Sequence, residues 1–119
     1  MNYNFNNDIP IYLQIVDIIT KEITSGILEP GNKLPSVREY AIIFKANPNT
    51  VAKALQILED NKLIYTERTN GKYVTKNLNV IDQSKIEIFD RKVKEFVNDL
   101  RLLGYSEEDL IKKIMEMKK

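Results

Sequence analysis

Apolar side chains recur at intervals of three and four residues in several stretches of the chain, which is the spacing of one helix face. The first stretch predicts a helix from Pro10 to about Ser25, with Asp8 near its cap and Pro10 at the first helical position. Gly26 is suited to end this helix. Its apolar face comprises Tyr12, Ile15, Val16, Ile19 and Ile23.

Two more helix starts follow close together. Ser36 and Glu39 have the spacing of a capping box, which predicts a helix from Ser36 to about Phe44. Asn47 and Pro48 provide the next cap and first turn, so another helix runs from Pro48 to about Asp60. This helix is expected to bury Val51, Ala54, Leu55 and Leu58.

The following segment, LIYTERTNGKYVTK, alternates and is rich in β-branched and aromatic residues, as in a β-hairpin. Asn70-Gly71 favours a two-residue type I′ turn, which needs positive φ at both central residues. We therefore expect strands at about Leu63–Arg68 and Lys72–Thr75. The next segment, Asn77–Gln83, has the composition of a linker.

From Ser84 onward the apolar residues follow the a and d spacing of a coiled coil over about two and a half heptads. This apolar seam comprises Ile86, Phe89, Val93, Phe96, Leu100 and Leu103. Gly104 ends the helix, and a capping box of Ser106 and Asp109 begins a last helix from Glu107 to about Lys118. The last helix is expected to bury Leu110, Ile111, Ile114 and Met115.

Two helices of this length cannot bury both of their apolar faces alone, so something else must cover them. One solution is a homodimer in which the seam is the interface. The other is that the seam folds back on the rest of the chain. We expect the homodimer, in which a second copy covers the seam.

Composition removes several classes of protein. The chain has no cysteine and no histidine, which excludes disulfides, thiolate metal sites and imidazole-based triads. Acidic pairs such as Glu59-Asp60 lie at helix ends, where dipole and cap effects account for them. We expect no enzyme, no cofactor and no metal. The chain start has no leader pattern and no apolar run is long enough to span a membrane, so we expect a cytoplasmic protein.

Positive charge gathers on one segment. Lys33 to Lys76 holds eight Lys and Arg against four Asp and Glu, although the whole chain has a net charge of only +1. Such a local excess is typical of a nucleic-acid-binding surface.

Helix, short turn, helix and β-ribbon make a winged helix-turn-helix, so the expected fold class is mainly α with a small β-hairpin wing. Asn49, Thr50 and Lys53 lie in the first turns of the second of the two helices, where side chains reach base edges in a major groove. Arg38 is placed to hold a phosphate or a guanine, Ser36 to hold a phosphate, and Arg68 to enter a minor groove. The full set of candidate DNA contacts is Lys33, Ser36, Arg38, Asn47, Asn49, Thr50, Lys53, Arg68, Gly71 and Lys72.

Simpler roles remain open for several of these residues. Ser36 is also explained as a helix cap, and Asn47 more readily as the cap of the helix that Pro48 begins. Lys33, Lys53 and Lys72 are also explained as solvated surface charges.

The segment from Pro10 to Val74 resembles the DNA-binding domain of GntR-family bacterial transcription regulators. The matching motifs are Pro10-Ile11-Tyr12, Gly31 followed by Leu34-Pro35-Ser36-Val37-Arg38, Asn47-Pro48-Asn49-Thr50-Val51, and Gly71-Lys72-Tyr73-Val74. The short tail with Leu103-Gly104-Tyr105-Ser106 is similar to the YtrA-like subfamily, whose members dimerise through it.

The resemblance implies a DNA-binding domain at residues 1–76 and a helical dimerisation tail at 77–119. It further implies a homodimeric repressor of a palindromic operator, with DNA contacts at Ser36, Arg38, Asn49, Thr50 and the wing around Gly71. Ala52 and Thr69 depart from the family pattern, which has a basic residue and a glycine there. The alternative is a winged helix that docks on another protein without binding DNA. An effector is not identifiable from the sequence.

Overall fold

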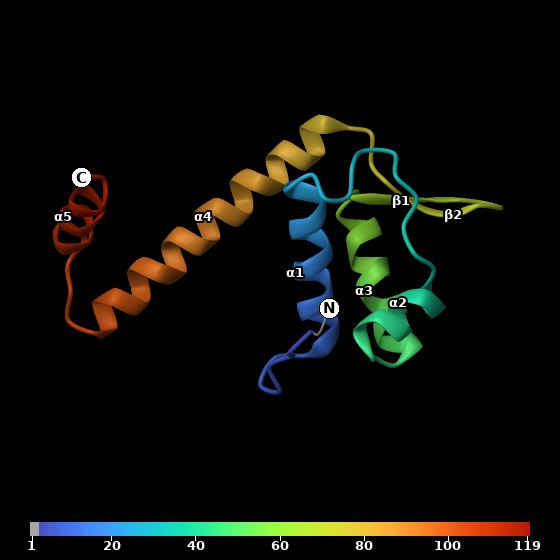
Figure 1. Cartoon of the computed structure of the whole chain (residues 1–119), viewed down its shortest axis with the longest axis horizontal. Coiled ribbons are helices and arrows are strands. Elements are labelled where there is room, and N and C mark those ends of the chain that lie inside the picture. Colours follow the sequence, from blue (N-terminus) through green and yellow to red (C-terminus); the bar gives the residue numbers. More distant parts are fainter. Residues whose placement is uncertain (1–2) are drawn as a thin grey trace. The chain divides into compact units, whose positions relative to one another are not determined.

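Three helices surround the apolar core of the first unit: α1 (Ile11–Thr24), α2 (Val37–Phe44) and α3 (Pro48–Asp60) (Figure 1). The computed structural model describes residues 3–119, and the chain forms two units, of which the first ends at Ser84 and the second is Lys85–Lys119. The predicted apolar faces are the ones that pack. The fully buried residues of α1 and α3 include Ile15, Ile19, Val51, Ala54, Leu55 and Leu58.

The predicted caps of α2 and α3 are confirmed. The Ser36 hydroxyl accepts a hydrogen bond from the Glu39 N–H (3.1 Å), and the Glu39 carboxylate accepts one from the Ser36 N–H (3.0 Å). The Asn47 side chain accepts from the Asn49 N–H at 2.7 Å, with Pro48 in the first turn. These local bonds satisfy backbone donors that have no partner within a helix, so each helix begins where its cap stands.

The start of α1 differs from its prediction. Pro10 is the cap and not the first helical residue, and it makes no side-chain cap hydrogen bond. The Gln14 amide instead binds the chain ahead of the helix: it donates to the carbonyls of Asn6 (2.7 Å) and Ile9 (2.8 Å) and accepts from the Asn6 N–H (2.8 Å). The preceding arm packs on α2, with the Tyr3 and Phe5 rings 4.8 Å and 6.2 Å from the Phe44 ring.

The hairpin forms where predicted, as β1 (Ile64–Glu67) and antiparallel β2 (Gly71–Val74). Its turn is not the predicted type I′. The Asn70 N–H donates to the Glu67 carbonyl (3.2 Å), and of these turn residues only Gly71 has positive φ, at 107°. Burial explains the difference, because Ile64 and Val74 are both in the core and therefore pair with each other. A two-residue turn at Asn70-Gly71 would put them on opposite faces of the hairpin.

The connector before α2 pairs with the outer edge of β2. The N–H of Leu34 donates to the Lys72 carbonyl (2.8 Å), and the N–H of Val74 donates to the Asn32 carbonyl (2.9 Å). The Gly31 N–H donates to the Val74 carbonyl (2.9 Å), and Lys33 and Tyr73 form a β-bridge. The wing is thus bordered on one side by a short third segment that leads directly into α2.

Asn77–Gln83 is not a linker, so that prediction was wrong. α4 (Leu78–Leu102) begins there, because the Asn77 side chain accepts from the Asn79 N–H (3.0 Å) and Ile81 is buried in the core of the first unit. The first unit includes the opening turns of α4 up to Ser84, and the division after residue 76 into a DNA-binding domain and a dimerisation tail stays a prediction.

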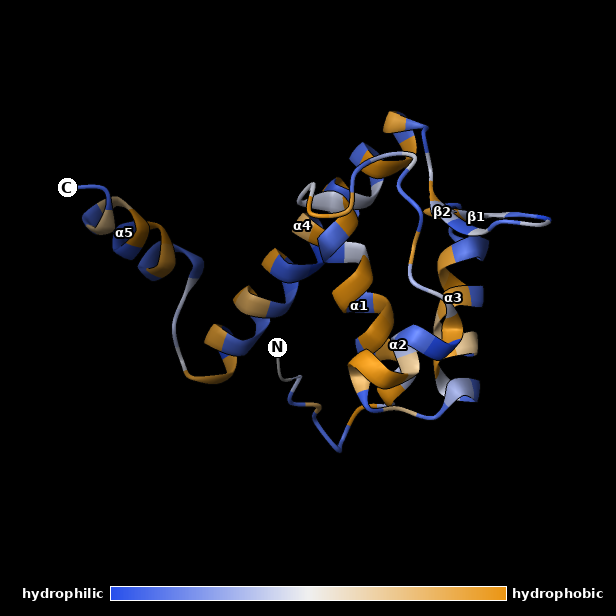
Figure 2. Ribbon diagram, turned by 45° about the vertical axis from the view of Figure 1, so that its right-hand side comes forward, coloured by the Kyte–Doolittle hydropathy of each residue, from blue (hydrophilic) through white to orange (hydrophobic). Residues whose placement is uncertain are grey.

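The second unit contains the rest of α4 and α5 (Glu107–Met117), which begins at the predicted capping box of Ser106 and Asp109. Figure 2 shows hydrophobic residues, in orange, along both helices. Many of their side chains are open to solvent. Those more than 40% exposed include Ile86, Phe89, Val93, Phe96, Leu103, Ile111, Ile114 and Met115. Within residues 3–119, no helix is long and apolar enough to cross a membrane.

The C-terminal end of α3 offers a test of backbone strain. Lys62 has a φ of 64°, and its neighbour Leu63 donates to the Leu58 carbonyl (3.0 Å), in the motif that usually carries glycine at this position. Lys62→Gly should therefore raise the free energy of unfolding by about 1 kcal/mol, the relief of left-handed strain less the added freedom of the unfolded chain. Thermal unfolding measures the change.

Asn61→Gly is the matched control, because Asn61 has an ordinary helical conformation (φ −80°, ψ 0°) and gains nothing from glycine. Equal stabilisation by both substitutions would contradict the explanation.

Candidate nucleic-acid interface

The first turn of α3 carries the predicted reading residues. Asn49 is exposed and Thr50 is half-buried, while Val51 beside them is fully buried in the core. Figure 2 shows polar colours on the side of α3 that faces away from α1. The Asn47 cap and Pro48 hold this turn, so Asn49 is presented at a fixed helix end. This is the geometry that base contact in a major groove requires.

Lys53 lies one turn further along α3, and its ammonium contacts an aromatic ring. Its Nζ lies 4.0 Å from the centre of the Tyr12 ring of α1. Such a cation–π contact at an exposed site contributes about 0.5–1 kcal/mol. It draws the Lys53 charge toward α1.

The start of α2 is the predicted phosphate site. Arg38 is exposed one residue into the helix. The Ser36 hydroxyl serves as the cap, so its simpler role is confirmed and its DNA contact stays a prediction. The hydrogen bonds from Ser36, first from its N–H and then from its side chain, lower the pKa of Glu39 below its ordinary value.

The wing presents its cations in two different ways. Arg68 is exposed in the turn between β1 and β2. Lys72 is half-buried, and its Nζ lies 2.9 Å from Thr66 Oγ1 and 3.3 Å from Glu59 Oε1. The Thr66 hydroxyl also donates to the Glu59 carboxylate. The hydrogen bond from Thr66, together with the weaker contribution of Lys72, lowers the pKa of Glu59.

Lys33 runs along the wing. A Cβ placed on Gly71 would lie 3.4 Å from Lys33 Cε, so the lysine stem packs against the glycine. The structure thus groups the candidate contacts at three places. Asn47, Asn49 and Thr50 are at the start of α3, Ser36 and Arg38 are at the start of α2, and Lys33, Arg68, Gly71 and Lys72 belong to the wing and its edge.

Sequence reasoning missed three residues that contact these groups. Tyr12 was expected only on the apolar face of α1, and Glu59 only as a charge at a helix end. Thr66 was not singled out. One signal was available for part of this set, since a correct hairpin register places Thr66 directly opposite Lys72.

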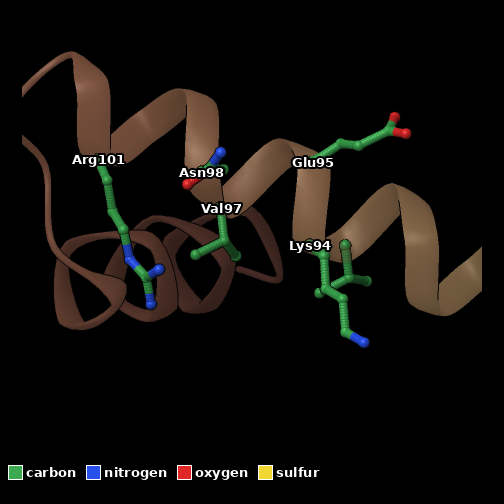
Figure 3. Close-up of a pocket in the computed structure, with 6 residues that line it drawn as sticks. Lys94, Glu95, Val97, Asn98 and Arg101 are labelled. Carbon is green, nitrogen blue, oxygen red and sulfur yellow. The ribbon is translucent and has the colours of Figure 1, made fainter.

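The second unit has a shallow hollow on α4. Figure 3 shows that Lys94 and Arg101 extend along it, whereas Glu95 points away. The Arg101 guanidinium pairs with the Glu107 carboxylate at the start of α5. The hollow is lined by Val93, Lys94, Glu95, Val97, Asn98 and Arg101. Among residues 3–119, no group of three or more acidic side chains is arranged to hold a metal ion.

Helices α2 and α3 with the β1–β2 wing define a winged helix-turn-helix protein. The chain matches the family model for bacterial regulatory proteins of the gntR family over residues 11–74, and it belongs to that family. The HTH-type transcriptional repressor YtrA of Bacillus subtilis (strain 168) is 38% identical over 109 residues, 91% of this chain and 84% of the relative. This likeness across the tail as well as the wing supports the YtrA-like subfamily.

Solved structures agree. A GntR family transcriptional regulator from Listeria monocytogenes has a TM-score of 0.86 and 38% identity, over 94% of this chain and 98% of that chain. AraR(DBD) in complex with operator ORR3 has a TM-score of 0.55 and 27% identity, over 63% of this chain and 88% of that chain. The chain is therefore a DNA-binding transcription regulator and not an enzyme, as predicted.

The capping box of α2 should be visible in a pH titration. Because the folded-state pKa of Glu39 is lowered, its contribution to stability is present above the ordinary pKa of 4.5 and is lost as the pH falls through the lowered value. Carbon-13 NMR of the Glu39 carboxyl measures this pKa directly. Ser36→Ala keeps the backbone N–H and removes only the side-chain hydrogen bond, so it should return the pKa part of the way toward 4.5. Ser106→Ala, in the equivalent box of α5, should leave it unchanged. An unshifted Glu39 in the native protein would contradict the capping role.

Proposed function

We propose that this protein is a homodimeric repressor that binds a palindromic operator, with α3 in the major groove and the wing in the minor groove. The observation that carries the proposal is the exposed first turn of α3, where Asn49 and Thr50 stand beside a cap of Asn47 and Pro48. Asn is suited to paired hydrogen bonds with adenine, and Thr to base edges or the thymine methyl group. That AraR(DBD) was solved with an operator, and that YtrA is a repressor, supports the proposal.

The surrounding cations would fix the protein on the duplex. Arg38 and the start of α2 are proposed to hold phosphate, with Lys33 along the wing as a further phosphate contact. Arg68, exposed in the hairpin turn, is proposed to enter the minor groove, where a narrow groove attracts arginine. We propose that the protein acts in the cytoplasm, because that compartment contains the bacterial DNA.

Dimerisation is proposed to occur through the seam of α4. Ile86, Phe89, Val93 and Phe96 are between 43% and 67% exposed in the single chain. Side chains of this size in an a and d repeat are stabilised when a second helix covers them. A second copy supplies that helix and also a second winged helix-turn-helix for the other half of the operator.

Substitutions in the two helices should separate affinity from specificity. Arg38→Ala should weaken binding to every duplex and lower the salt slope by about 1 per subunit, because a phosphate contact is lost. Asn49→Ala should cost about 1–3 kcal/mol on the specific duplex and relax preference at particular bases. Titrations on a duplex selected from random DNA and on a random duplex measure both effects.

Lys21→Ala is the control for a simple loss of positive charge, because Lys21 is exposed on α1, outside the proposed contacts, and pairs with Asp17 at 2.8 Å. Binding that is unaffected by Arg38→Ala and Asn49→Ala, with a flat response to salt, would favour the protein-docking alternative.

The seam has its own test. Phe96→Lys should convert the dimer to a monomer in sedimentation experiments and weaken operator binding, because a charge would enter the covered seam. Glu95→Lys places the same side chain on the neighbouring residue, outside the seam, and gives up only an exposed ion pair with Arg91 (3.8 Å). It should leave the dimer intact. A Phe96→Lys protein that is still dimeric would exclude the seam as the interface.

A further inference from the structure

Glu59 joins three elements of the first unit through its carboxylate. It lies in the last turn of α3, and its Oε1 accepts from Thr66 of β1 and from Lys72 of β2. Thr66 and Lys72 are direct cross-strand partners, and the Lys72 ammonium also donates to the Thr66 hydroxyl at 2.9 Å. Helix α3, which we call the reading helix, is therefore bonded to both strands of the wing through one carboxylate.

The charges of this cluster cancel. Lys72 brings one positive charge and Glu59 one negative charge, at 3.3 Å, and their side chains are only 27% and 32% exposed. The lowered pKa of Glu59 keeps its carboxylate ionised at neutral pH. A lysine held in this way loses its partners if it swings out to meet a phosphate, so its charge is not freely available to DNA.

We propose that Glu59 is a positioning residue for DNA binding: it ties the wing to the reading helix and holds the Lys72 charge away from the phosphate backbone. Glu59, Thr66 and Lys72 together form what we call the strut, which has no net charge. Lys72 belongs to this strut and is not a phosphate contact, in contrast to the role expected from the sequence. The inference rests on the docking mode proposed above, since it concerns a wing that approaches DNA.

The strut has a consequence for affinity. When the negative charge of Glu59 is removed, Lys72 is released to reach phosphate, and the bond between the wing and α3 weakens to a neutral hydrogen bond. Binding to any DNA should become tighter and more sensitive to salt. The ratio of specific to random binding should fall, because the wing is held less firmly relative to α3.

A double-mutant cycle tests this with Glu59→Gln, Lys72→Met and the combination of both, in the whole chain of 119 residues. The probes are a duplex selected from random DNA and a random duplex, titrated between about 50 and 200 mM salt. Glu59→Gln should bind the random duplex severalfold more tightly, with a slope steeper by about 0.9 per subunit. Lys72→Met should bind more weakly, because it leaves an unpaired carboxylate near the DNA.

The double variant distinguishes a neutral strut from a phosphate contact by Lys72. If the strut is neutral, removing both charges should recover most of the affinity that Lys72→Met loses, with the native salt slope. If Lys72 is a phosphate contact, the double variant should remain as weak as Lys72→Met, with a slope lower by about 0.9 per subunit, and the proposal is overturned. It is also overturned if Glu59→Gln weakens binding to the random duplex.

Two controls keep these outcomes distinct. Lys72→Arg preserves both charges and should leave the salt slope unchanged, and thermal unfolding of each variant shows that it is folded at the titration temperature. Arg68→Ala should lower the salt slope if the wing meets DNA. A native slope in both Arg68→Ala and Arg38→Ala would reject the docking mode itself, whereas a loss in these two variants with no rescue in the double variant would reject the strut alone.

Discussion

The backbone pairing between residues 31–34 and β2 is the constraint on which the proposed DNA-binding surface depends. A two-stranded hairpin alone is marginally stable in water. Here the Leu34 N–H bonds to the Lys72 carbonyl and the Leu34 side chain is buried, so the connector is held to the wing and to the core together. Because Ser36 follows at once as the cap of α2, the same bonds fix where α2 starts relative to the wing. The family motif around Leu34 therefore serves to position α2 relative to the wing.

Features set by neighbours in the chain were predictable from the sequence, and features set by tertiary contacts were not. The caps at Ser36 and Asn47 and the position of the hairpin depend on a few adjacent residues, and all three are confirmed. The turn type failed because burial of the core pair fixed the register, and Asn77–Gln83 was misread because its helix is anchored by one buried isoleucine, Ile81. The contacts of Glu59 depend on how α3 packs beside the hairpin. No pattern among neighbouring residues in the sequence predicts that packing.

Two of the eight cations counted between Lys33 and Lys76 are held by neighbouring side chains. Lys53 lies over the Tyr12 ring, and Lys72 is paired with Glu59. Arg38 and Arg68 are exposed, at the start of α2 and in the wing turn. A modest number of well-placed arginines suits a regulator that must leave random DNA easily, since each neutralised phosphate strengthens binding to every sequence alike.

The aromatic arm before α1 links two parts of the fold that the reading helix depends on. Tyr3 and Phe5 pack against Phe44, at the end of α2 and just before the turn that leads to Asn47. The Gln14 amide fastens the same arm to α1. Truncation of the arm would therefore remove the aromatic side chains that support the end of α2, although none of them is a proposed DNA contact.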